Sequence, residues 1–148
     1  MKDIEQLLKE VKRIHFIGIG GSGMCPLAEI LHTKGYLLSG SDNNEGDTLN
    51  RVKALGIPVY MGQRAENIGD AEMVVFTAAL MPDNPELCAA KSMGVPTFER
   101  SKLFGAITRK FGSCIGVCGT HGKTTVTAMI SHVLRALDVP HTAIIGGT

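Results

Sequence analysis

The residues best suited to chemistry lie in a short glycine-rich segment, GTHGKTT, which runs from Gly119 to Thr125. An apolar run, 114–118, precedes it, and a stretch with helical spacing follows it. In a strand–loop–helix unit of this kind the loop amides bind phosphate oxygens, and Lys123 places a positive charge against the β and γ oxygens. The Thr124 hydroxyl can complete the coordination shell of a bound Mg²⁺. We therefore predict an ATP-binding loop in which Lys123 and Thr124 are catalytic and Thr124 is the Mg²⁺ ligand. The predicted ATP-binding residues are Gly119, Thr120, His121, Gly122, Lys123, Thr124 and Thr125.

Two positions of this segment need comment. Val117 stands where the usual phosphate-binding loop has a further glycine. His121 has two interpretations, because a loop histidine can lie near a triphosphate or can be a solvated turn residue. The sequence does not decide between them.

A second glycine pattern, G-x-G-x-x-G, is formed by Gly18, Gly20 and Gly23. It follows the apolar run 14–17 and opens a helical stretch, which is the position where such glycines bring the backbone close to a nucleotide phosphate. Asp42 lies about twenty residues further on, where an acid in such folds meets a nucleotide sugar or base. This pattern predicts a nucleotide site, with a purely structural glycine turn as the alternative.

The elements around both loops alternate between short apolar runs and helical stretches. We expect strands at 14–17, 36–39, 57–61, 73–78 and 95–98, and helices at 4–11, 22–34, 49–55, 85–94 and 101–110. Alternation at this spacing predicts an α/β fold, a Rossmann-like parallel sheet with helices on both faces. The break at 111–113 predicts a domain of residues 1–110. Residues 111–148 would then begin a second α/β domain with a strand at 114–118, the loop, a helix from Lys123 to about Leu137 and an apolar run at 142–145.

Composition excludes several classes of partner. A net charge of +1 gives no field that would gather nucleic acid or an anionic membrane. No apolar run approaches the roughly 20 residues needed to cross a bilayer. The four cysteines form no CxxC pair, so we expect free thiols and a cytoplasmic protein.

Four segments together resemble the Mur ligase family: IHFIGIGGSGM at 14–24, SGSD at 39–42, DNPE at 83–86 and GTHGKTT at 119–125. The likeness spans nearly the whole chain in the family's order. It accounts for Val117, because Mur ligases have G-T-x-G-K-T without the earlier glycine. It also implies a longer enzyme with three domains, of which this chain matches the first and the opening strand, loop and helix of the second.

The resemblance implies that the first glycine loop holds the diphosphate of a UDP-sugar rather than a dinucleotide, with Asp42 near the uridine. The implied UDP-sugar-binding residues are Gly18, Gly20, Gly21, Ser22, Gly23, Asp42, Thr77, Ala78, Asn84 and Glu86. The last four could equally be turn or cap residues, and Asn84 before Pro85 is a helix-start signal by itself.

The reaction implied by the resemblance uses UDP-N-acetylmuramate, ATP and L-alanine. ATP phosphorylates the sugar nucleotide's carboxylate, and the amine of L-alanine attacks the resulting acyl phosphate to form an amide. We expect the chain as given to bind UDP-sugar without turnover. Two alternatives remain, an NAD-type redox or sensing domain and the related ligase that attaches a whole recycled peptide to the same sugar nucleotide. The oligomeric state stays open.

Overall fold

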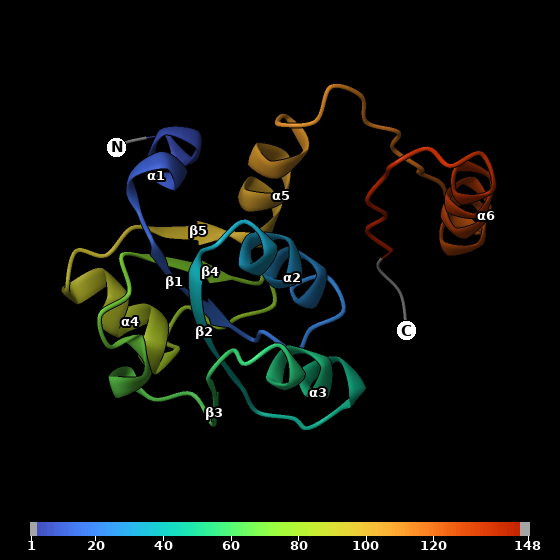
Figure 1. The fold of residues 1–148 in the computed structure, drawn as a ribbon. Coiled ribbons are helices and arrows are strands. Elements are labelled where there is room, and N and C mark those ends of the chain that lie inside the picture. Colours follow the sequence, from blue (N-terminus) through green and yellow to red (C-terminus); the bar gives the residue numbers. More distant parts are fainter. Residues whose placement is uncertain (1–2, 146–148) are drawn as a thin grey trace.

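The fold is an all-parallel sheet of five strands in the order β3-β2-β1-β4-β5, seen in a computed structural model that describes residues 3–145 (Figure 1). The strands are β1 (Arg13–Ile17), β2 (Leu37–Asp42), β3 (Val59–Met61), β4 (Met73–Phe76) and β5 (Thr97–Glu99). The helices are α1 (Ile4–Glu10), α2 (Cys25–Thr33), α3 (Asp47–Ala54), α4 (Pro85–Ser92), α5 (Arg100–Thr108) and α6 (Lys123–Ala136), with a 3₁₀ turn η1 (Ala65–Ile68). The predicted parallel sheet with helices on both faces is confirmed.

Alternate residues of the central strand supply two separate cores. Ile14 and Phe16 of β1 pack with α1, α2 and α5 on one face, whereas Ile17 packs with α4 and η1 on the other. The same alternation in β4 sends Val75 to the first core and Val74 to the second. Side chains of a strand point to opposite faces in turn, so an apolar run buried on both faces is expected for a parallel sheet covered by helices.

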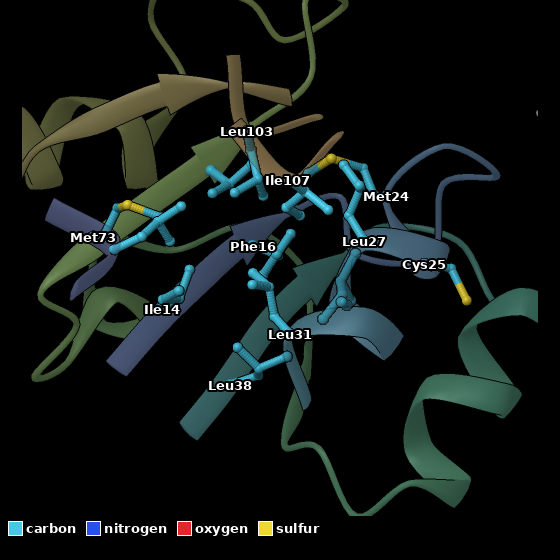
Figure 2. Close-up of a cluster of buried hydrophobic side chains, with 14 of the residues drawn as sticks. Ile14, Phe16, Met24, Cys25, Leu27, Leu31, Leu38, Met73, Leu103 and Ile107 are labelled. Carbon is cyan, nitrogen blue, oxygen red and sulfur yellow. The ribbon is translucent and has the colours of Figure 1, made fainter. Parts of the chain in front are cut away.

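Figure 2 shows how the first core closes over β1. Phe16 points toward Leu27 and Leu31 of α2, and Leu103 and Ile107 of α5 close the core above it. All five side chains are at most 1% exposed. Each contributes about 1.5–3 kcal/mol to the free energy of unfolding through burial of apolar surface. This packing fixes α2 and α5 on the sheet, and with them the loops that precede these helices.

The strand predicted at 114–118 is wrong. These residues and the apolar run 142–145 have no regular structure, although α6 forms as predicted between them. A strand exists only when a neighbouring strand takes up its amides and carbonyls, and no such neighbour lies in the described part of the chain. β2 differs in the other direction, since it continues to Asp42 instead of ending at Ser39.

α6 lies beyond α5, away from the sheet, whereas Ile144 in the segment after it packs against the first core (Figure 1). α6 has no buried residue, and its apolar side chains Val126, Met129 and Val133 are all at least 43% exposed. The division into domains 1–110 and 111–148 stays a prediction. Among residues 3–145, no helix combines the length and the apolar character that crossing a bilayer requires.

Candidate functional site

The first glycine loop joins β1 to α2 at the carboxyl edge of the sheet, and β2 holds it in place. The amides of Gly18 and Ile19 donate to the Ser41 carbonyl at 2.8 and 3.0 Å. The Gly20 amide donates to Asp42 Oδ2 at 2.9 Å. In the strand order β3-β2-β1-β4-β5, the strands β2 and β3 are added on one side of β1, and β4 and β5 on the other, so the order of addition reverses between β1 and β4. Ligands of open α/β sheets bind in the crevice at such a switch point, so the loop occupies the position expected for a ligand site.

Asp42 acts here as a clamp on two backbone amides. Besides the Gly20 amide at Oδ2, its Oδ1 accepts the Asn44 amide at 3.0 Å. The side chain therefore fixes the loop, and its predicted place near the uridine stays a prediction.

The amides of Ser22 and Gly23 are the groups of the loop that remain available to a ligand. The Gly21 amide is taken by the Gly18 carbonyl at 3.1 Å, and the Cys25 amide by the Gly21 carbonyl at 2.9 Å. Within residues 3–145 no hydrogen bond uses the Ser22 or Gly23 amide. Ser22 is exposed and Gly23 is half-buried. Two amides without a hydrogen-bond partner next to the start of a helix can bind an anion.

Arg100 was missed in the sequence, and the structure places it at this loop. It is the first residue of α5, directly after β5, and its guanidinium lies so close to Gly23 that a methyl group there would overlap it. Arg100 is exposed, so the guanidinium offers its donors at the mouth of the loop. The position of Arg100 directly after β5 could have revealed it, because the carboxyl ends of parallel strands share one edge of the sheet.

Thr77 and Ala78 directly follow β4, which lies on the opposite side of β1 from β2. The Thr77 methyl carbon lies 3.9 Å from the point where a Cβ on Gly18 would stand. Its carbonyl accepts the Leu80 amide at 3.0 Å, which makes the segment a turn. Ala78 is exposed beside it. The structure thus brings both residues to the same edge as the glycine loop, and their contact with a sugar nucleotide stays a prediction.

Asn84 caps α4. Its Oδ1 accepts the amides of Glu86 and Leu87 at 3.0 and 3.1 Å, and its Nδ2 donates to Gln63 Oε1. Asparagine satisfies the otherwise unpaired first amides of a helix in this way. Asn84 is 7% exposed. The capping role that the sequence left open is the one seen here.

Glu86 is wholly buried, although it was predicted among the residues that bind the ligand. Ser41 Oγ donates to its Oε2 at 2.6 Å, and Asn67 Nδ2 donates to its Oε1. His15 Nε2 lies 3.6 Å from Oε2. Burial opposes ionisation, but the interactions with His15, Ser41 and Asn67 outweigh it and hold the pKa of Glu86 below its usual value. Glu86 is therefore an internal carboxylate under the loop.

The second glycine loop leads directly into α6. Gly122 has φ +77°, a left-handed conformation that favours glycine, and Lys123 begins the helix. Lys123 Nζ donates to the carbonyls of Gly119 and Thr120 at 2.7 and 3.4 Å. The first amides of a helix have no acceptor within it, so the loop presents donors and a cation together. Residues 119–125 are all exposed.

Comparison with protein families assigns residues 13–112 to the Mur ligase family, catalytic domain. The chain belongs to the Mur ligase family. The family resemblance seen in the sequence motifs is thereby confirmed.

Individual relatives agree with this assignment. The UDP-N-acetylmuramate–L-alanine ligase of Sulfurihydrogenibium sp. strain YO3AOP1 is 45% identical over 93% of this chain. The crystal structure of UDP-N-acetylmuramate-alanine ligase from Thermotoga maritima matches 85% of this chain with a TM-score of 0.82 and 38% identity. The match spans only 30% of the length of each of these relatives.

A murein peptide ligase is also similar. The structure of UDP-N-acetylmuramate:L-alanyl-gamma-D-glutamyl-meso-diaminopimelate ligase from Neisseria meningitides matches 86% of this chain and 40% of that one, with a TM-score of 0.79 and 32% identity. Among these structures the identity is higher for the alanine ligase. Neither the peptide ligase nor the NAD-type alternative is favoured.

Proposed function

We propose that this chain is the N-terminal part of an ATP-dependent ligase that joins L-alanine to the carboxylate of UDP-N-acetylmuramate in peptidoglycan biosynthesis. The proposal is supported by the names of the relatives, which are alanine ligases at 42–49% identity. Cytoplasmic location, predicted from the sequence, is part of the same proposal.

The observation that carries the proposal is the glycine loop at the switch point of the sheet. The free amides of Ser22 and Gly23 are neutral donors, and the Arg100 guanidinium beside them adds a positive charge. A diphosphate ester needs both, because hydrogen bonds orient its oxygens and a cation offsets their charge. The first domain, 1–110 in this proposal, would therefore hold the UDP part of the substrate.

The loop at 119–125 would hold ATP and Mg²⁺. Its fit rests on the position of the loop at the start of α6 and on Lys123, whose Nζ contacts the loop carbonyls and can turn from them to phosphate oxygens. ATP supplies the phosphoryl group that activates the substrate carboxylate. Lys123 would offset charge on that group, and Thr124 would be a Mg²⁺ ligand.

Binding without turnover is expected of this chain alone. The two glycine loops would account for phosphate recognition, whereas none of the described side chains is assigned to L-alanine. Residues 111–148 would supply only the opening of the ATP-binding domain.

Saturation-transfer NMR with UDP-N-acetylmuramate and NAD in parallel samples tests the ligand class. We expect transfer to the uridine and sugar protons and none to NAD. Transfer to NAD alone would contradict the proposal. A coupled assay for ADP with all three substrates tests turnover, and ADP release that depends on both UDP-N-acetylmuramate and L-alanine would refute the expectation of an inactive fragment.

A further inference from the structure

The buried carboxylate of Glu86 is an expensive group for a fold to contain. Glu86 is 0% exposed, and the removal of a carboxylate from water costs free energy that its hydrogen bonds must offset. A group of this kind is better explained by the direction that its hydrogen bonds impose than by stability. The partners of Glu86 show which part of the molecule it directs.

The first route from Glu86 leads to the start of the glycine loop. Glu86 Oε2 accepts the Ser41 hydroxyl at 2.6 Å. The Ser41 carbonyl in turn accepts the amides of Gly18 and Ile19 at 2.8 and 3.0 Å. Ser41 is itself 0% exposed. Any shift of Ser41 therefore moves the acceptor on which the loop begins.

The second route leads to the middle of the loop. Oε1 of Glu86 accepts Asn67 Nδ2, which also donates to the Gly62 carbonyl at 2.9 Å. The Gly62 amide donates to the Asp42 carbonyl at 2.8 Å, and Asp42 Oδ2 accepts the Gly20 amide at 2.9 Å. One carboxylate thus reaches both of the last residues of β2, and both of these hold the loop.

His15 completes the cluster from the strand that leads into the loop. Its Nδ1 shares a hydrogen bond of 2.9 Å with Ser39 Oγ, while Nε2 lies 3.6 Å from Glu86 Oε2. Within the described residues, His15 Nε2 is a buried side-chain nitrogen without a hydrogen bond. Its NMR signal is therefore a sensitive reporter of a small movement of Glu86.

We propose that Glu86 is a positioning residue. It fixes the position and orientation of the glycine loop through Ser41 and Asp42, so that the Ser22 and Gly23 amides face the ligand. The inference rests on the proposed function, because the loop is taken to bind the UDP-sugar diphosphate. It differs from the expectation that Glu86 touches the sugar nucleotide.

Calorimetric affinities for UDP-N-acetylmuramate provide the first test. Ser41→Ala removes the hydroxyl and keeps the carbonyl, and we expect affinity to fall about tenfold, the loss of roughly one well-made buried hydrogen bond. Glu86→Ala should lose at least as much. Glu86→Gln should stay within about threefold of the unmodified chain, because its amide can still bridge both routes.

Ser39→Ala is the matched control. It also removes a hydroxyl from β2 that contacts the same buried cluster, but the Ser39 carbonyl does not hold the loop. We expect it to bind within about twofold of the unmodified chain. Equal affinity of the Ser41→Ala and unmodified chains would overturn the proposal. Should Glu86→Ala fail to fold, Ser41→Ala decides alone.

Amide spectra without ligand separate this inference from the proposed function. Ser41→Ala should shift the amide signals of Gly18, Ile19 and Gly20 and the His15 ring nitrogens, and leave those of β5 unchanged. Unchanged loop amides would overturn the positioning role even if the nucleotide binds. If the unmodified chain does not bind UDP-N-acetylmuramate, the proposed function fails. The amide shifts caused by Ser41→Ala still test the positioning role in that case.

Discussion

Replacement of Gly40 by alanine should shift the glycine loop, because the added methyl group would press on the buried side of that loop. Gly40 lies in β2, and a Cβ built on it would stand 2.7 Å from the Cβ and Cδ1 of Ile19 and 2.8 Å from its Cγ2. Ile19 is 0% exposed and lies between Gly18 and Gly20 of the loop. The new methyl group therefore meets a side chain that has no free space to enter.

The size of the effect follows from this geometry. Carbon atoms in contact prefer about 3.5–4.0 Å, so Ile19 must move by roughly 1 Å. Overpacking of this kind costs about 1–3 kcal/mol, and the lower entropy of the unfolded chain returns about 0.4–1 kcal/mol. We expect Gly40→Ala to lower the free energy of unfolding by about 1–2 kcal/mol, or Tm by roughly 2–8 °C.

Binding should weaken as well, because Ile19 carries the loop with it. If the loop bears about 1.4 kcal/mol of the strain, affinity for UDP-N-acetylmuramate falls about tenfold. Thermal unfolding followed by circular dichroism, together with calorimetric titration, measures both effects on one sample.

Gly105→Ala is the control with the opposite sign. Gly105 lies within α5, and the nearest atom to a Cβ there is the terminal nitrogen of the Arg109 side chain at 3.5 Å, an ordinary contact. Alanine in a helix is favoured over glycine by about 0.8–1 kcal/mol, so Tm should rise. If Gly40→Ala left both Tm and affinity unchanged, or behaved as Gly105→Ala does, the tight contact between β2 and the loop would be refuted.

Three further outcomes are expected. Arg100→Ala should weaken UDP binding about five- to tenfold in calorimetry, with Arg100→Lys intermediate, and an effect that vanishes at low salt would contradict a charge contact. Glu86 has a lowered pKa, so the stability it contributes is complete above about pH 5 and is lost as pH falls below its ordinary value of 4.5. As the pH is lowered, the urea midpoint should therefore fall less in Glu86→Gln than in the unmodified chain. Equal slopes of the urea midpoint against pH in the two chains would contradict this. Burial, followed by the Glu29 charge, raises the pKa of Cys25 to about 11, so a thiol reagent at pH 8 should spare it in the native chain while it labels the exposed cysteines, and rapid labelling of Cys25 would contradict the structure. Those exposed cysteines are Cys88, Cys114 and Cys118.

The sequence pattern predicted the layers well because the apolar runs of β1 and β4 are local signals. It also located the glycine loop, since Gly18, Gly20 and Gly23 follow a strand directly. The true end of β2 was missed because Ser41 and Asp42 look like loop residues. Only the fold reveals that Ser41 is buried against Glu86, which lies 45 residues further along the chain.

Long-range contacts account for the other differences. The strand expected at 114–118 needs a partner that no local pattern supplies, and it does not form. Arg100 joins the site only because β5 and β1 end at the same edge of the sheet. Gly40 carries no conformational signal of its own, and its need for glycine comes from the position of Ile19.

Titration of an isotope-labelled chain with UDP-N-acetylmuramate, followed by amide spectra, tests the central claim most directly. The claim is that main-chain amides at the junction of β1 and α2 bind the diphosphate. We expect the largest shifts at Ser22 and Gly23, with smaller ones through the rest of the loop. Binding that leaves these two amide signals in place, or no binding at all, would contradict the account.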